Sequence, residues 1–258
     1  MTTLDLFHLN GKTAIITGGG RGIGQYFAEA LADAGANVVL CSRKLAACEE
    51  VQREIEDRGG KALALACDVT RQSDAQQVVE TTLQHFGAVD ILVNNSGATW
   101  GAPAEQMPLD KFDHVIDVNI KGTFIMSQLV GNAMIARGQG GKIINIASIA
   151  GLIGGNPKYF QAAGYHASKG AIVNMTRDLA TSWARYGITV NAIAPGWFST
   201  HMSRGLMELH EKEMLADIPL ARFGKPDDLK GIIVFLASSA ADYMTGQTVV
   251  VDGGITAW

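Results

Sequence analysis

The sequence predicts an α/β fold: a doubly wound, seven-stranded parallel sheet with helices on both faces, in a three-layer αβα arrangement. Short apolar runs alternate along the chain with segments of helical periodicity, which is typical of parallel strands joined by crossover helices. A glycine-rich turn lies between the first strand-like run and the first helix-like segment. No linker, repeat or low-complexity segment interrupts the pattern, so residues 1–258 are expected to form a single domain.

The individual elements follow from the same periodicities. Strands are expected at 12–17, 36–41, 62–67, 89–94, 142–147, 188–194 and 247–251. Helices are expected at 22–34, 45–58, 74–86, 109–136, 160–186 and 226–240. Pro108 suits the start of the fourth helix, because proline is favoured in a first turn. Right-handed crossovers would then cover both faces of the sheet.

The first turn has the composition of a pyrophosphate-binding turn. Residues 12–17 form a strand-like run, and the segment 18–24 follows it, with Gly18, Gly22 and Gly24 at the key positions. Glycines permit a tight turn and close backbone approach, while the N-terminus of the next helix offers free N–H groups to a pyrophosphate. The spacing is one residue wider than the common G-x-G-x-x-G. A nucleoside triphosphatase is not favoured, because its phosphate loop needs Gly-Lys-Ser/Thr where this chain has Gly-Ile-Gly.

Three polar residues form a candidate proton-transfer site. Ser148 follows the fifth strand-like run, and Tyr165 and Lys169 lie four residues apart on the next helix, on one helix face. A phenol has a pKa of about 10, and a nearby ammonium favours the phenolate; a shift of ~3 units requires ~4 kcal/mol. On its own the pair also fits a solvated lysine beside a packed tyrosine. The glycine turn implies a hydride carrier and so favours acid–base chemistry on an alcohol or carbonyl.

Taken together, these motifs resemble the signature of the classical short-chain dehydrogenase/reductase (SDR) family. The matching segments are Thr17–Gly24, Asn94-Asn95-Ser96-Gly97, Asn119, Ser148, Tyr165-x-x-x-Lys169 and Pro195-Gly196. They occur in the family's order across nearly the whole chain. Ser96 is a departure, since the family usually has alanine there, and only local packing depends on it. The resemblance implies a Rossmann-type fold and a dehydrogenase acting on CH–OH groups, with hydride exchange at the nicotinamide C4.

The resemblance also implies a role for each catalytic residue. Tyr165 would transfer the proton, and Ser148 would hydrogen-bond the substrate oxygen. Lys169 would lower the pKa of Tyr165 and bind the nicotinamide ribose, while Asn119 would hold a water that reconnects Tyr165 to solvent. Some members of the fold bind a dinucleotide without turnover, but they usually lack one of these residues. A non-catalytic regulator is therefore the less favoured alternative.

The end of the second strand-like run indicates which dinucleotide is bound. An NAD enzyme typically places Asp or Glu there to bind the ribose 2′-hydroxyl, but this chain has Ser42, followed by Arg43. A guanidinium can bind a 2′-phosphate with charge-assisted hydrogen bonds, and Arg21 in the glycine turn offers a second cation. Arg43 and Lys44 also fit ordinary solvated charges. The missing acid beside an arginine favours NADP(H) over NAD(H).

Further cofactor contacts are expected from the resemblance. Asp68, followed by Val69, is similar to the adenine-binding acid, although an aspartate there also fits a helix cap. Asn94 would bind a cofactor ribose. The remaining expected contacts are Ile23, Asn95, Gly97, Pro195, Gly196 and Thr200, of which the last three resemble the segment that contacts the nicotinamide carboxamide.

The substrate is the least determined feature. Arg137 and Arg185 fall roughly where β-ketoacyl-acyl carrier protein reductases present arginines to the acidic carrier, which indicates a carbonyl reductase similar to 3-oxoacyl reductases. Segments 5–12 and 194–200 instead resemble gluconate 5-dehydrogenases and related polyol enzymes. The predicted function is therefore a carbonyl reductase similar to 3-oxoacyl reductases, with a sugar acid or polyol dehydrogenase as the alternative.

Two segments are expected to shape the substrate pocket. The connection 197–220 is long and rich in Trp, Phe, Met and Leu, Met202 included; it resembles the family's substrate lid, although an amphipathic helix packed on the domain also fits. The segment Gly154–Gln161 lengthens the connection between Ser148 and Tyr165. Aromatic residues near the pocket would suit an apolar or medium-sized ketone, or would serve as packing: Trp100, Tyr159, Phe160, Trp197 and Phe198.

Composition and charge exclude several other functions. The formal net charge is −4, and no basic run indicates a nucleic-acid or membrane partner. Neither a secretory signal pattern nor an apolar run of ~18 residues is present, so a cytoplasmic protein is expected. Cys41, Cys48 and Cys67 lack metal-ligand spacing and are expected to be reduced; no metal site is predicted. The resemblance implies a homotetramer, or a dimer, that acts on a small carbonyl or alcohol.

Overall fold

Seven parallel strands form one sheet at the centre of the molecule. The computed structural model describes residues 2–201 and 203–258. Its strands are β1 (Thr13–Thr17), β2 (Asn37–Ser42), β3 (Lys61–Ala66), β4 (Ile91–Asn94), β5 (Gly141–Ile146), β6 (Ile188–Pro195) and β7 (Thr248–Val251). They are ordered β3-β2-β1-β4-β5-β6-β7, and every neighbouring pair is parallel. The predicted fold class is confirmed, with strand ends that differ from the expected ones by one or two residues.

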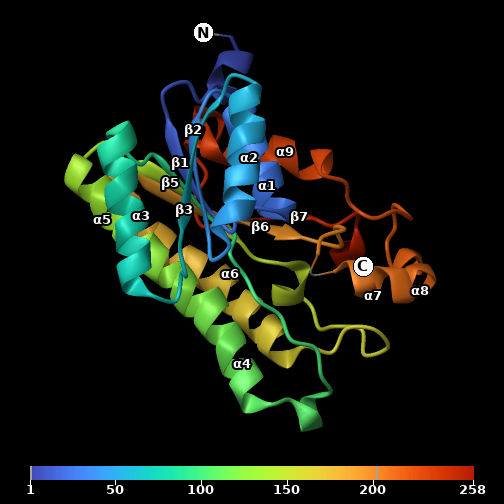
Figure 1. Cartoon of the computed structure of the whole chain (residues 1–258). Coiled ribbons are helices and arrows are strands. Elements are labelled where there is room, and N and C mark those ends of the chain that lie inside the picture. The colour runs from blue at the N-terminus through green and yellow to red at the C-terminus, as the bar shows by residue number, and fades with distance from the viewer. Residues whose placement is uncertain (1, 202) are drawn as a thin grey trace.

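Helices cover both faces of this sheet (Figure 1). One face packs against α1 (Gly22–Asp33), α2 (Leu45–Asp57) and α9 (Asp227–Ala237), and the other against α3 (Gln72–Phe86), α5 (Gly122–Arg137) and α6 (Ala163–Trp183). The alternation of side chains along each strand explains both layers. In β1, Ala14 and Ile16 enter the first layer, and Ile15 enters the second.

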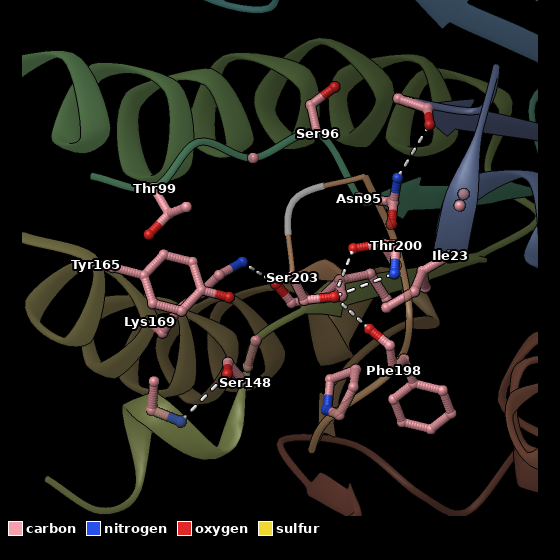
Figure 2. A pocket seen from close by; sticks show the side chains of 18 of the residues that line it. Ile23, Asn95, Ser96, Thr99, Ser148, Tyr165, Lys169, Phe198, Thr200 and Ser203 are labelled. Atoms are coloured by element: carbon pink, nitrogen blue, oxygen red, sulfur yellow. Dashed lines mark hydrogen bonds between the residues drawn. The ribbon is translucent and has the colours of Figure 1, made fainter. Parts of the chain in front are cut away.

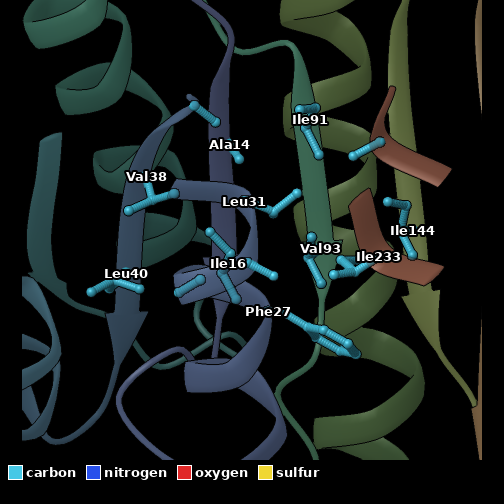
Figure 3. Packing of buried hydrophobic residues seen from close by; sticks show 14 of the residues in the cluster. Ala14, Ile16, Phe27, Leu31, Val38, Leu40, Ile91, Val93, Ile144 and Ile233 are labelled. Atoms are coloured by element: carbon cyan, nitrogen blue, oxygen red, sulfur yellow. The ribbon is translucent and has the colours of Figure 1, made fainter. Parts of the chain in front are cut away.

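The first layer shows how closely the helices are held to the sheet (Figure 3). Phe27 and Leu31 of α1 and Ile233 of α9 are fully buried against Ile16 and Val93 of the sheet. Full burial of one such side chain contributes roughly 1.5–3 kcal/mol relative to exposure. Packing of this kind fixes the N-terminus of α1, and with it the glycine turn, above the end of β1.

Two segments depart from the expected elements. The helix expected at 109–136 is divided into α4 (Leu109–Ile116), a π-helical turn (Asp117–Lys121) and α5. Such turns occur often at functional sites, and this one contains Asn119. The connection 197–220 contains two short helices, α7 (Arg204–Leu209) and α8 (Glu211–Ala216), while Met202 lies outside the described residues. This connection does both things expected of it, because Met207 and Met214 are buried in the molecule while Trp197 and Leu206 line the cavity.

The strand order determines where a ligand can bind. Because β1 lies between β2 and β4, the connections after β1 and β4 leave in opposite directions and open a crevice at the carboxyl edge of the sheet. A cavity of about 810 Å³ occupies this edge. In the described part of the chain, no helix is long and apolar enough to cross a membrane.

Candidate active site

The glycine turn has backbone angles that glycine adopts readily, as its sequence predicts. Gly18 and Gly22 have φ angles of +67° and +57°, which residues with a side chain rarely adopt. Gly24 is required for a different reason: a Cβ there would lie 2.3 Å from the carbonyl oxygen of Gly18. Asn95 donates from its Nδ2 to the carbonyl oxygens of Thr17, at 3.0 Å, and Gly18, at 3.2 Å. The turn is thereby held between the ends of β1 and β4.

Most of the predicted site residues line one continuous cavity. Figure 2 shows Tyr165, Lys169 and Ser148 gathered on one side of it, with Ile23, Asn95 and Thr200 on the other. The predicted residues in the lining are Gly18, Arg21, Gly22, Ile23, Gly24, Ser42, Arg43, Asp68, Val69, Asn95, Gly97, Ser148, Tyr165, Lys169, Pro195, Gly196 and Thr200. The structure therefore brings together residues spread over more than 180 positions of the sequence.

The end of β5 and the start of α6 carry the proton-transfer residues. Ser148 follows β5 and caps a short 3-10 turn, where its hydroxyl accepts a hydrogen bond from the N–H of Ala150 at 3.2 Å. Tyr165 and Lys169 lie one helical turn apart, with the Lys169 Nζ 5.6 Å from the centre of the Tyr165 ring. The Lys169 side chain is buried and donates to the carbonyl oxygen of Ile146 at 2.6 Å.

Burial determines the protonation of this pair. It raises the pKa of Tyr165 above the usual value for a phenol, and the hydrogen bond with Ser148 acts in the opposite direction. Burial also lowers the pKa of Lys169 to about 8. The expected lowering of the Tyr165 pKa by Lys169 is not seen in the protein alone, where burial raises this pKa and the opposing effect comes from Ser148. Tyr165 is therefore a protonated phenol at neutral pH, the form that donates a proton.

Asn119 and Asn94 lie behind the cavity lining. Asn119 is 1% exposed; its Oδ1 accepts from the N–H of Ala98 at 2.7 Å, and its Nδ2 donates to the Ala98 carbonyl oxygen at 2.9 Å and to the Ser168 hydroxyl at 2.8 Å. The side chain thus joins the segment after β4 to α6, next to Lys169. Both Nδ2 hydrogens are used in these bonds, so the Asn119 side chain positions the neighbouring segments, and its hold on a relay water stays a prediction.

The prediction for Asn94 also needs correction. Its Nδ2 donates to the hydroxyl of Ser127 and to Oδ1 of Asn145, both at 2.9 Å, and the side chain is buried in the helical layer. Side chains alternate along a strand, and Asn94 points into the core where Asn95 points to the glycine turn. An expected ribose contact of the Asn94 side chain is therefore replaced by a structural role.

Two exposed arginines, Arg21 and Arg43, lie at the edge of the cavity near the end of β2. The hydroxyl of Ser42 donates to the carbonyl oxygen of Lys44 at 3.0 Å and accepts from the Lys44 N–H at 3.2 Å, so it serves the turn itself. Arg21 and Arg43 are exposed at the cavity, and neither forms an ion pair within the described residues. Asp68 also lines the cavity, close enough to Arg43 to be affected by its charge. Although burial acts to raise the pKa of Asp68, hydrogen bonds from Thr70 and the charge of Arg43 lower it, so its carboxylate is ionised.

Aromatic side chains form the wall of the cavity beside Tyr165. The Phe160 ring lies 5.9 Å from the Tyr165 ring and 5.3 Å from the Trp197 ring, in edge-to-face contacts. Tyr159 and Phe198 also line the cavity. Trp100 differs: it is 44% exposed, lies outside the lining, and stacks under the Lys111 ammonium.

The two arginines expected to meet an acidic carrier lie at the wrong edge of the sheet. Arg137 donates to Asp90, directly before β4, at 2.9 Å, and Arg185 stacks on Tyr186, just before β6. The cavity is at the carboxyl ends of these parallel strands, whereas both arginines are at the amino ends. Within one chain, both arginines therefore lie away from the cavity.

Sequence reasoning missed two residues that hold the site together. Ser168 joins Asn119 to the Tyr165 carbonyl oxygen, to which it donates at 2.8 Å. The position of Ser168 between Tyr165 and Lys169 in the sequence could have indicated this role. Asp217, after α8, accepts hydrogen bonds from Tyr159 and Asn156 across the cavity mouth. A single acid in an exposed connection carried no such signal.

Known proteins share both the sequence and this geometry. Residues 18–256 match a family model described as enoyl-(acyl carrier protein) reductase. A 2-dehydro-3-deoxy-D-gluconate 5-dehydrogenase of Dickeya dadantii is 42% identical over 97% of this chain and 98% of its own. A 3-oxoacyl-[acyl-carrier-protein] reductase of Synechocystis is 40% identical, over 96% and 98%. The crystal structure of a gluconate 5-dehydrogenase from Burkholderia cenocepacia, in complex with NADP and tartrate, is 38% identical, with a TM-score of 0.94 over 100% of both chains. With this fold, glycine turn and Ser–Tyr–Lys site, the chain belongs to the short-chain dehydrogenase/reductase family.

Proposed function

We propose that the protein is an NADP(H)-dependent oxidoreductase that interconverts a ketone and a secondary alcohol on a small polyol or sugar acid. The observation that carries this proposal is the meeting of Ser148, Tyr165 and Lys169 in the cavity into which the glycine turn opens. The family's oxidoreductase chemistry needs both parts in one place. Neither part was informative without the other.

The residues at the carboxyl edge of the sheet fit a dinucleotide. The N-terminus of α1 and the glycines before it leave backbone N–H groups at the cavity without side chains in the way, which suits a pyrophosphate. Arg43 and Arg21 supply cations where a 2′-phosphate would lie, and no carboxylate occupies position 42. A nicotinamide dinucleotide bound there supplies the hydride that the chain itself lacks.

Side chains of this site would provide the proton and fix the reacting oxygen. In the reductive direction, the Tyr165 phenol donates its proton to the carbonyl oxygen while Ser148 donates a hydrogen bond to the same oxygen. The phenolate that remains is stabilised by the Lys169 ammonium and takes up a proton from solvent. In the oxidative direction the same proton returns to Tyr165. A preference for NADP(H) would favour the reductive direction in the cell.

Two findings favour a polyol or sugar acid over a carrier-bound acyl chain. Arg137 and Arg185, the residues on which carrier docking depended, lie at the opposite edge of the sheet from the cavity. Both the Dickeya relative and the Burkholderia structure bear the names of sugar acid dehydrogenases. A substrate bound to a carrier remains the second candidate, because the Synechocystis relative is named for it at similar identity.

The test is a substrate panel run with NADP(H) and NAD(H) in parallel. The panel contains polyols, sugar acids and their keto forms, and 3-oxoacyl thioesters. We expect the greatest kcat/KM with NADP(H) on a polyol or sugar acid. A greater kcat/KM on 3-oxoacyl thioesters would favour the second candidate, and dinucleotide binding without turnover of any class would favour a regulator.

The assembly is a separate proposal. We infer a homotetramer, as the family commonly forms, because large apolar side chains are exposed on α4, on α5, on β7 and at the last residue. These side chains are Leu109, Phe124, Val250 and Trp258. Light scattering is expected to give a mass near four times the 27.4 kDa of one chain.

A further inference from the structure

The segment Gly154–Gln161 forms a compact loop at the cavity mouth. The Asn156 carbonyl oxygen accepts from the N–H groups of Tyr159 and Phe160, at 3.2 and 2.8 Å, and the Asn156 Oδ1 accepts from the N–H of Lys158. The Gln161 carbonyl oxygen accepts from the N–H of Ala102, which ties the end of the loop to the segment after β4. The loop therefore holds its own shape, and the Nδ2 of Asn156 is left to point outward.

One carboxylate oxygen joins this loop to α8. The Tyr159 hydroxyl donates to Oδ2 of Asp217 at 2.7 Å, and the Nδ2 of Asn156 donates to the same oxygen at 3.1 Å. Asp217 is itself firmly placed, because Met214 before it and Ile218 after it are buried in the molecule. Both bonds are partly buried and have a carboxylate as acceptor, and bonds to a carboxylate are stronger than bonds between neutral groups.

This contact fixes the aromatic wall beside the catalytic phenol. The Tyr159 ring lies 6.1 Å from the Trp197 ring, and its neighbour Phe160 lies between Trp197 and Tyr165. Burial, together with the bond to Asp217, raises the pKa of Tyr159 to about 12. The phenol therefore stays protonated throughout the working range and keeps donating to Asp217.

We propose that Tyr159 and Asp217 form a latch that holds the Gly154–Gln161 loop closed against α8, and that Tyr159 is thereby a positioning residue that sets the substrate-binding wall. Asn156 is the second donor of this latch. The inference rests on the proposed function for its kinetic consequence, but the latch itself is a property of the chain. The latch would thus control substrate affinity from a position away from Ser148, Tyr165 and Lys169.

The kinetic test compares Tyr159→Phe and Asp217→Ala with wild type. The substrate is the panel compound with the greatest wild-type kcat/KM. Tyr159→Phe removes one charge-assisted hydrogen bond, and Asp217→Ala removes both that bond and the one from Asn156. We therefore expect KM for this substrate to rise about tenfold in Tyr159→Phe and at least as much in Asp217→Ala, while kcat stays within about threefold and the Kd for NADPH is unchanged. The double variant should behave like Asp217→Ala, since that change already removes the acceptor of the Tyr159 hydroxyl. Asp217→Asn, whose Oδ1 can still accept, should restore most of the affinity.

Matched controls and a second measurement separate the latch from the proposed function. Tyr243→Phe removes a hydroxyl from a fully exposed tyrosine and should leave every constant unchanged. Amide hydrogen exchange should become faster in residues 154–161 in both latch variants and not in the control, whether or not a substrate has been found. Unchanged exchange there would overturn the latch, as would additive effects in the double variant or an unchanged KM. If the wild-type protein does not bind NADPH, or converts no compound of the panel, that result would instead count against the proposed function.

Discussion

The Lys169 ammonium donates a 2.6 Å hydrogen bond to the carbonyl oxygen of Ile146, the last residue of β5. Ser148 follows two residues later, and Tyr165 lies one turn before Lys169 on α6. This buried contact joins the strand that precedes the serine to the helix that carries the tyrosine. Lys169 therefore has two roles: it connects β5 to α6, and it places a positive charge beside Tyr165.

Burying this charge lowers stability in a pH-dependent way. The folded protein holds the pKa of Lys169 at about 8, against 10.5 for an exposed lysine, so the unfolded chain binds more protons between these values and stability rises with pH there. Relative to a Lys169→Met variant, the free energy of unfolding of wild type should therefore increase by about 2 kcal/mol between about pH 7 and pH 9.5. Urea unfolding of both proteins across this range measures it. A constant difference between them would contradict the burial of a charged lysine.

Cofactor choice should depend on Arg43. Removing a guanidinium that binds a 2′-phosphate costs roughly 1.5–3 kcal/mol, so Arg43→Ala should raise KM for NADPH about tenfold to a hundredfold and leave KM for NADH nearly unchanged. Arg53→Ala, an exposed arginine on α2, is the control and should change neither constant. If Arg43→Ala raises KM equally for NADPH and NADH, Arg43 does not bind the 2′-phosphate.

The glycine turn should tolerate no side chain at Gly24. A Cβ there would lie 2.3 Å from the Gly18 carbonyl oxygen and would displace the turn, so Gly24→Ala should reduce NADPH affinity by more than tenfold. Gly231→Ala on α9 is the matched control. A Cβ at Gly231 meets no atom within 4 Å, and the change should stabilise the helix by roughly 0.5–1 kcal/mol with normal NADPH binding. Fluorescence titration and thermal unfolding measure the two effects.

The width of the pocket should depend on Phe160. Because its ring fills the space between Trp197 and Tyr165, Phe160→Ala should open room beside the reacting oxygen. We expect kcat/KM to fall for the best small substrate and to rise for ketones with a bulkier substituent. Trp100→Ala, at an aromatic outside the cavity, serves as control. Uniform loss across substrates of every size would instead indicate that Phe160 only supports Tyr165.

Sequence periodicity was sufficient for the sheet, the helical layers and most of the cavity. The runs containing Ile15, Val39 and Leu92 are buried on both faces of a parallel sheet, and such runs have few alternative structures. The glycine turn was equally predictable, because the φ angles of Gly18 and Gly22 exclude most other residues.

What could not be predicted depends on direction and on contacts between distant segments. Asn94 and Asn95 are adjacent, and only the path of the chain after β4 decides which of them faces the glycine turn. Arg137 is close to the site along the sequence but lies at the opposite end of α5 from it. The partnership of Tyr159 with Asp217 spans 58 residues and rests on the packing of α8, which no local pattern reveals.

The central claim is that Tyr165 transfers the proton in a chain that binds NADP(H). The most direct measurement compares wild type with Tyr165→Phe in NADPH oxidation by the best ketone of the panel, alongside the Kd for NADPH. We expect Tyr165→Phe to bind NADPH with unchanged affinity and to lose turnover by at least about a thousandfold, consistent with the loss of a general acid. Turnover by Tyr165→Phe close to that of wild type would contradict the assignment.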